Sequence, residues 1–65
     1  MDKQKIIIIA TEPSGDYLGS ELIKEIRKKK PNIKFYGIGG ELMIKNGLDS
    51  IIPIKELSVN GIFEV

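Results

Sequence analysis

Residues 6–16 read Ile-Ile-Ile-Ile-Ala-Thr-Glu-Pro-Ser-Gly-Asp, and this stretch decides the fold. The four consecutive isoleucines leave no polar face, which is typical of an inner parallel strand covered on both sides. The composition then changes to residues that favour a tight loop and the start of a helix. Because ligands of open α/β sheets bind outside the carboxyl ends of the strands, a site is expected to begin at this loop.

An amphipathic helix is predicted after the loop, with either Ser14 or Asp16 as its capping residue. Pro31 forbids its continuation, and a run of basic residues before that proline suits the negative end of the helix dipole. One stripe of apolar side chains, suited to lying on a sheet, comprises Leu18, Leu22, Ile23 and Ile26.

A second strand is predicted over residues 33–38, which completes a strand–helix–strand unit with parallel strands. Gly39-Gly40 ends this strand, residues 41–45 suit one or two helical turns, and Asn46-Gly47 supplies a left-handed helix end. The fold class is therefore α/β, with a partial Rossmann-like parallel sheet.

The last part of the chain continues this pattern. Residues 51–54 are predicted to form a third strand, where Pro53 indicates a short or edge position. Residues 57–65 begin another apolar segment, for which a helix is one interpretation. With one full helix, one side of the isoleucine run is expected to stay uncovered, so the chain either opens a larger domain or self-associates.

Composition narrows the function classes. The 65 residues are 42% apolar and 29% charged, as in one small globular domain, and the net charge of +1 gives no support for a nucleic-acid partner. Cysteine and histidine are both absent, so no disulfide and no metal site is expected. No cofactor is predicted either. The longest apolar run is far shorter than the roughly 18 residues of a membrane span, which predicts a cytoplasmic protein.

Two interpretations of the loop are open. Backbone amides at the helix start, with the Ser14 hydroxyl, can hold an anionic or sugar-phosphate group, while Glu12 and Asp16 accept hydrogen bonds from sugar hydroxyls or serve as a base. Otherwise the loop is a plain strand-to-helix turn. Gly39-Gly40 either lets a backbone approach a ligand or only turns the chain. Neither the dinucleotide-binding glycine fingerprint nor a Walker A loop is present.

The order of these residues resembles the opening of the lipid-A-disaccharide synthase family. The matching pattern is Ala10-x-Glu12-x-Ser14-Gly15-Asp16-x-x-Gly19, Leu22-Ile23, Pro31, Phe35-x-Gly37-Ile38-Gly39-Gly40, Met43, Gly47, Leu57-x-Val59-x-Gly61 and Glu64-Val65. Three positions depart from the family's usual residues: Thr11 stands for glycine, Glu41 for proline and Asn60 for methionine. Thr11 is β-branched, whereas the loop backbone at this position normally needs the conformational freedom of glycine. The loop is therefore expected to differ from that of the family.

The resemblance implies a two-domain GT-B glycosyltransferase, with residues 1–65 as the N-terminal part of the first, acceptor-side Rossmann-like domain and no complete second domain. Such enzymes transfer 2,3-diacylglucosamine from UDP to 2,3-diacylglucosamine 1-phosphate by an inverting displacement, in which a carboxylate takes the acceptor proton. Contact with the inner membrane surface is implied as well. The resemblance assigns no catalytic residue in this chain, and assigns to the substrate cleft Glu12, Ser14, Gly15, Asp16, Gly39 and Gly40.

The chain alone is expected to be inactive, because catalysis needs groups from both domains. A small standalone phosphate- or nucleotide-binding module without catalysis is the alternative, and a decayed remnant without activity is a third hypothesis.

Overall fold

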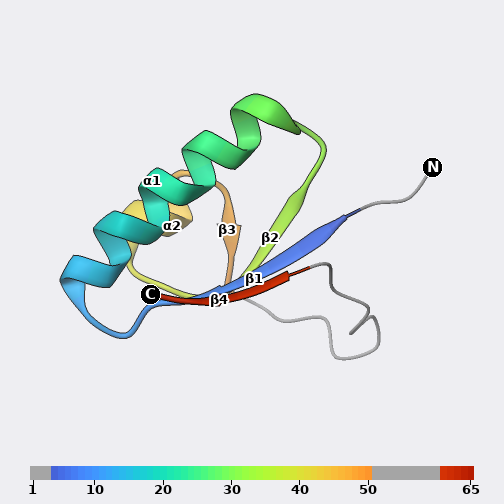
Figure 1. Cartoon of the computed structure of the whole chain (residues 1–65). Coiled ribbons are helices and arrows are strands. Elements are labelled where there is room, and N and C mark those ends of the chain that lie inside the picture. The colour runs from blue at the N-terminus through green and yellow to red at the C-terminus, as the bar shows by residue number, and fades with distance from the viewer. Residues whose placement is uncertain (1–3, 51–60) are drawn as a thin grey trace.

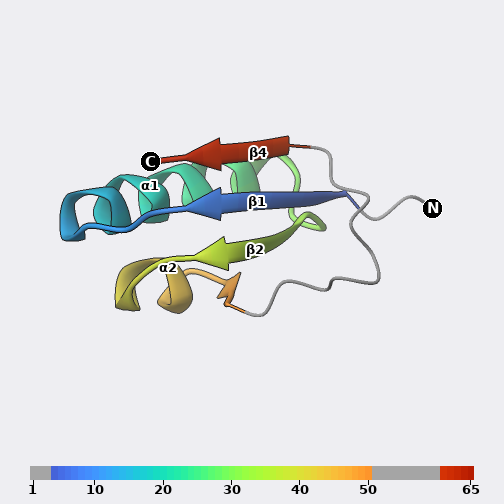
Figure 2. The same ribbon diagram turned by 90° about the horizontal axis from the view of Figure 1, so that it is seen from below.

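The protein is an α/β structure built on one sheet of parallel strands (Figure 1). The computed structural model describes residues 4–50 and 61–65. The elements are β1 (Lys5–Ile9), α1 (Pro13–Lys29), β2 (Lys34–Ile38), α2 (Glu41–Lys45), β3 (Leu48–Asp49) and β4 (Gly61–Glu64). The strand order is β3-β2-β1-β4, and the two helices lie on the same face of the sheet (Figure 2). The predicted fold class is therefore confirmed.

β1 is an inner strand, as the isoleucine run predicts. It pairs in parallel with β2 on one side and β4 on the other. Ile8 is fully buried beneath the helices, and Ile7, which points to the opposite face, is only 7% exposed. Among the described residues no helix covers the face of Ile7 (Figure 2), as expected, although Ile7 itself is largely shielded and Ile9 is half-buried.

The start of α1 differs from the prediction. Glu12 is the capping residue, with extended backbone and no side-chain cap, and Pro13 opens the helix, so neither Ser14 nor Asp16 caps it. Proline suits this first position because its φ is preset and its missing N–H would have no helical partner.

The buried face of α1 is narrower than the predicted apolar stripe. Gly15, Gly19 and Ile23, spaced by four residues, form its centre, whereas Leu18 is 57% exposed. Periodicity alone pointed to large apolar side chains, but the close approach of neighbouring elements selects glycine here. Leu18 is therefore removed from the predicted core, while Leu22 and Ile26 are partly buried and pack against it.

The second half of the chain gives a mixed outcome. α2 has the predicted bounds, and Gly47 after it has a φ of 112°, the left-handed conformation expected there. The predicted strand at residues 51–54 lies outside the described residues. The helix interpretation for residues 57–65 is wrong at residues 61–64, which form β4 and take their hydrogen bonds from β1 instead.

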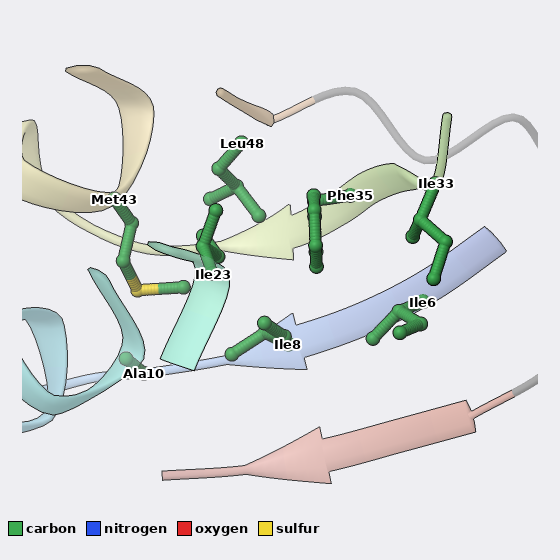
Figure 3. Close-up of a cluster of buried hydrophobic side chains, with 8 residues drawn as sticks. All are labelled: Ile6, Ile8, Ala10, Ile23, Ile33, Phe35, Met43 and Leu48. Carbon is green, nitrogen blue, oxygen red and sulfur yellow. The ribbon is translucent and has the colours of Figure 1, made fainter. Parts of the chain in front are cut away.

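A single apolar cluster joins the helices to the sheet (Figure 3). Met43 of α2 and Ile23 of α1 are both fully buried, and they meet side chains of three strands. Phe35 of β2 lies in the same cluster and carries the Arg27 guanidinium 5.6 Å from its ring centroid, a cation–π contact. The short α2 is therefore fixed from inside, through Met43.

Gly37 is the position in β2 where a side chain is least tolerated. Its φ of 142° is disfavoured for other residues, and an added Cβ would overlap the backbone carbonyl of Ile8. We expect Gly37→Ala to lower the free energy of unfolding by about 2–4 kcal/mol, since strain and overpacking add. Lys34→Ala, at an exposed position of the same strand, is the control for urea unfolding. Equal midpoints for the two variants would contradict this prediction.

Candidate functional site

A hollow of about 650 Å³ lies at the carboxyl ends of β1 and β2, where ligands of open α/β sheets bind. We call it the crevice. Its walls come from the loop between β1 and α1 and from the segment that joins β2 to α2. The described residues that line it are Ala10, Thr11, Glu12, Pro13, Asp16, Ile38, Gly39, Gly40, Glu41 and Leu42.

Glu12 offers a free carboxylate to the crevice. The residue is exposed, and its side chain makes no cap hydrogen bond to α1. Within residues 4–50 and 61–65, its carboxylate has no hydrogen bond or ion pair. Pro13 holds the backbone directly after it, so the side chain projects from a defined position. Glu12 is therefore available to accept hydrogen bonds from a ligand.

Asp16 lies in the same crevice but is used differently. Its Oδ1 accepts hydrogen bonds from the backbone N–H groups of Gly40 at 2.9 Å and Met43 at 3.0 Å. Its Oδ2 accepts one from Leu42 N–H at 3.1 Å. These donors are the otherwise unpaired amides at the start of α2. Asp16 thus caps α2 from the first turn of α1.

These contacts set the protonation of Asp16. Partial burial raises the pKa of its carboxyl, but the hydrogen bonds from the backbone of Met43, Leu42 and Gly40 lower it, and the net pKa lies below the ordinary value. The side chain is therefore ionised at neutral pH and in its best state to accept all three bonds.

The glycine pair after β2 is explained by its neighbours. A Cβ on Gly39 would lie 2.5 Å from Met43 Sδ, and a Cβ on Gly40 would lie 2.6 Å from Asp16 Oδ2. Neither side chain can withdraw freely, because Met43 is fully buried and Asp16 is held by three amides. The absence of side chains at residues 39–40 thus lets α2 dock, and it leaves bare backbone in the crevice wall.

Four of the six predicted cleft residues line the crevice, namely Glu12, Asp16, Gly39 and Gly40. Ser14 and Gly15 are not among its lining residues. Ser14 is exposed in the first turn of α1. Gly15 is buried where the end of β4 passes, and a Cβ there would lie 2.9 Å from the Val65 carbonyl oxygen. Gly15 therefore serves packing between α1 and β4.

Several residues of the crevice wall are not among the predicted cleft residues. Ile38 and Leu42 are exposed apolar side chains at the crevice, and Glu41 adds a third carboxylate at its rim. Thr11 lines the crevice too, and the resemblance marks Thr11 and Glu41 only as departures from the family's usual residues. The available signal was the order of the chain, because each of these residues lies within two positions of the end of β1 or of Gly39-Gly40.

The charge of the crevice is one-sided. Three carboxylates line it, and the described lining residues include neither lysine nor arginine. Another hollow, of about 390 Å³, lies beside Arg27, Lys34 and Asp49, away from the loop after β1. We place the candidate site in the crevice because it alone of these two combines the strand ends with the loop that begins α1. Its walls suit a ligand with apolar parts and hydrogen-bond donors.

Comparison with known proteins identifies the family. The fold and crevice define an α/β protein of Rossmann-like type, and the sequence model described as lipid-A-disaccharide synthetase matches residues 6–65. The chain belongs to the lipid-A-disaccharide synthetase family, which confirms the resemblance.

Individual relatives of the chain carry the same family name. The chain is 52% identical over 58 residues to the lipid-A-disaccharide synthase of Hydrogenovibrio crunogenus, a match that covers 89% of this chain and 15% of that protein. It is 50% identical over 56 residues to the synthase of Chlamydia caviae, covering 86% and 9%. It is 46% identical over 61 residues to lipid-A-disaccharide synthase 2 of Legionella pneumophila, covering 94% and 16%. The chain therefore spans about one-sixth of its relatives or less.

No helix among the described residues is long and apolar enough to cross a membrane.

The Asp16 contacts predict a pH dependence of stability. Because the folded-state pKa is lowered, Asp16 stabilises the fold fully above the ordinary carboxyl pKa of about 3.9, and this stabilisation is lost as the pH falls through the lowered pKa. We expect the free energy of unfolding to fall more steeply between about pH 5 and pH 2 in the unsubstituted chain than in Asp16→Asn. Urea unfolding across this range measures both slopes, and equal slopes would contradict the prediction.

Proposed function

We propose that this chain is part of a lipid A glycosyltransferase that transfers 2,3-diacylglucosamine from UDP to 2,3-diacylglucosamine 1-phosphate, forming the lipid A disaccharide and UDP. The family match over residues 6–65 is the observation that carries this proposal. The chain supplies the N-terminal part of the acceptor-side domain in a two-domain GT-B enzyme. Alone it is inactive, because the second domain and the base that takes the acceptor proton lie outside these residues.

The crevice supports a role on the sugar side of the substrates. A phosphate would meet the carboxylates of Glu12, Asp16 and Glu41 without a compensating cation from the described wall. A neutral acylated sugar fits better, since hydroxyl groups can donate to Glu12 while acyl chains contact Ile38 and Leu42. We therefore assign the wall to the hydroxyl- and acyl-bearing part of a substrate, with Gly39 and Gly40 as bare backbone beside it.

Location and partners follow from the same proposal. We propose a cytoplasmic enzyme that reaches its lipid substrates at the inner membrane surface through peripheral contact. Self-association is a further element of the proposal, supported by β4, an edge strand whose Ile62 and Phe63 are exposed. Ser14 and Gly15 stay in the proposal only because they follow the loop that lines the crevice.

A standalone phosphate- or nucleotide-binding module is the second candidate. The observation in its favour is the start of α1, which has no side-chain cap and an exposed Ser14 in its first turn. Titration of the 65-residue chain with UDP, FMN and simple sugar phosphates tests it. Tight saturable binding would favour the module, and we expect none because the nearby crevice is acidic.

The free carboxylate of Glu12 gives the direct test of the proposed site. We use a chimera in which this chain replaces the matching segment of the Hydrogenovibrio crunogenus relative. Glu12→Gln should lower kcat/KM for UDP release by about 10- to 100-fold, the value of a charge-assisted hydrogen bond. Glu25→Gln, a surface position paired with Lys28, is the matched control and should leave turnover unchanged.

Two results would count against the proposal. If the unsubstituted chimera releases no UDP, the segment does not serve this reaction. If the chimera is active and Glu12→Gln retains full kcat/KM, the crevice assignment is wrong while the family function stands.

A further inference from the structure

We propose that Asp16 is a positioning residue of the glycosyltransferase and does not itself bind substrate. This inference rests on the proposed function and reassigns one of its cleft residues. Asp16 acts through α2: its carboxylate holds the start of that helix, and with it the Gly39–Gly40 wall of the crevice, in one place.

The carboxylate of Asp16 is already largely occupied by backbone donors. An ionised carboxylate has about four lone-pair positions, and the backbone amides of Gly40, Leu42 and Met43 occupy three of them. One position, on Oδ2, is left beside the Leu42 amide, whereas Glu12 in the same crevice has all of its positions open. The three amides therefore commit Asp16 mainly to α2, and we assign the substrate hydroxyl to Glu12.

The helix α2 needs a capping group from another part of the chain. The capping position of α2 is Gly40, which has no side chain and makes no side-chain cap bond. A helix of five residues has little stability of its own, because few intrahelical bonds offset the cost of its nucleation. Asp16 replaces the missing cap across 24 to 27 residues of sequence. Met43 then anchors the opposite side of α2 in the core.

The start of α2 is also part of the crevice wall. Gly39, Gly40, Glu41 and Leu42 all line the hollow, and the first amide held by Asp16 belongs to Gly40 itself. A shift of α2 therefore moves the wall directly. Because a displaced wall complements the bound sugar less well, this anchoring affects substrate affinity without contact between Asp16 and the substrate.

Asp16→Asn is the sharpest substitution, since it keeps the shape of the side chain. The amide can accept from two of the three backbone N–H groups, but its own NH₂ group must then face the third donor. In the chimera described above, hydrogen exchange of residues 40–46 should become at least about tenfold faster, while exchange of residues 19–29 stays unchanged. KM for the acceptor sugar should rise about tenfold, with kcat within about threefold.

The outcomes separate three roles. Faster exchange together with a raised KM supports positioning. Unchanged exchange in the unliganded protein with a raised KM would identify Asp16 as a direct ligand and overturn the proposal. Faster exchange with unchanged KM, measured well below both melting temperatures, would leave only a structural role and overturn it too. Glu25→Gln is the control for all measurements.

A second measurement covers the case in which Asp16→Asn fails to fold. In the unsubstituted chimera, exchange of residues 40–46, corrected for the intrinsic pH effect, should accelerate as the pH falls through the lowered Asp16 pKa. Glu12 and Glu41 are the other titratable groups that line the crevice with Asp16. The variants Glu12→Gln and Glu41→Gln show whether either of them causes the effect, and both variants should keep the acceleration. Its absence in the unsubstituted protein overturns the proposal. A chimera that fails to turn over counts against the proposed function alone, since exchange is read without activity.

Discussion

One carboxylate ties together the two halves of the described structure. Asp16, in the first turn of α1, accepts the three backbone amides that begin α2, and this contact fixes the approach of two segments that are far apart in sequence. The close approach of α1 and α2 explains three glycines, because a side chain at Gly40 would strike Asp16 and one at Gly19 or Gly39 would strike Met43. The position of α2, and so the shape of the crevice, depends on this set of contacts.

The same constraint divides the acidic residues of the crevice by role. Asp16 is turned inward and neutralises the positive end of α2, whereas Glu12 has no described partner and Glu41 is exposed at the rim. A wall with free carboxylates, exposed apolar side chains and no described cation suits acylated sugar better than phosphate. Under the proposed function, the charged groups that hold phosphate or UDP are expected in the five-sixths of the relatives' length that this chain does not match.

The sequence predicts the parts of the fold that depend on local patterns. The isoleucine run, the glycine pair and Asn46-Gly47 place β1, the end of β2 and α2 within a residue or so. Periodicity failed for Leu18, because close packing on α1 selects glycines rather than large apolar residues. It also failed at β4, whose pairing with β1 is non-local. The site was predicted as a set of polar residues near one loop, but their roles depend on hydrogen bonds between distant segments that spacing does not reveal.

The central claim is that Asp16 faces inward to α2 while Glu12 faces the substrate. The most direct test is a crystal structure of the full-length chimera with 2,3-diacylglucosamine 1-phosphate bound. We predict Asp16 oxygens within hydrogen-bonding distance of the Gly40, Leu42 and Met43 amides, and a sugar hydroxyl on Glu12. A structure in which Asp16 leaves those amides to bind the sugar, with Glu12 in solvent, would contradict the claim.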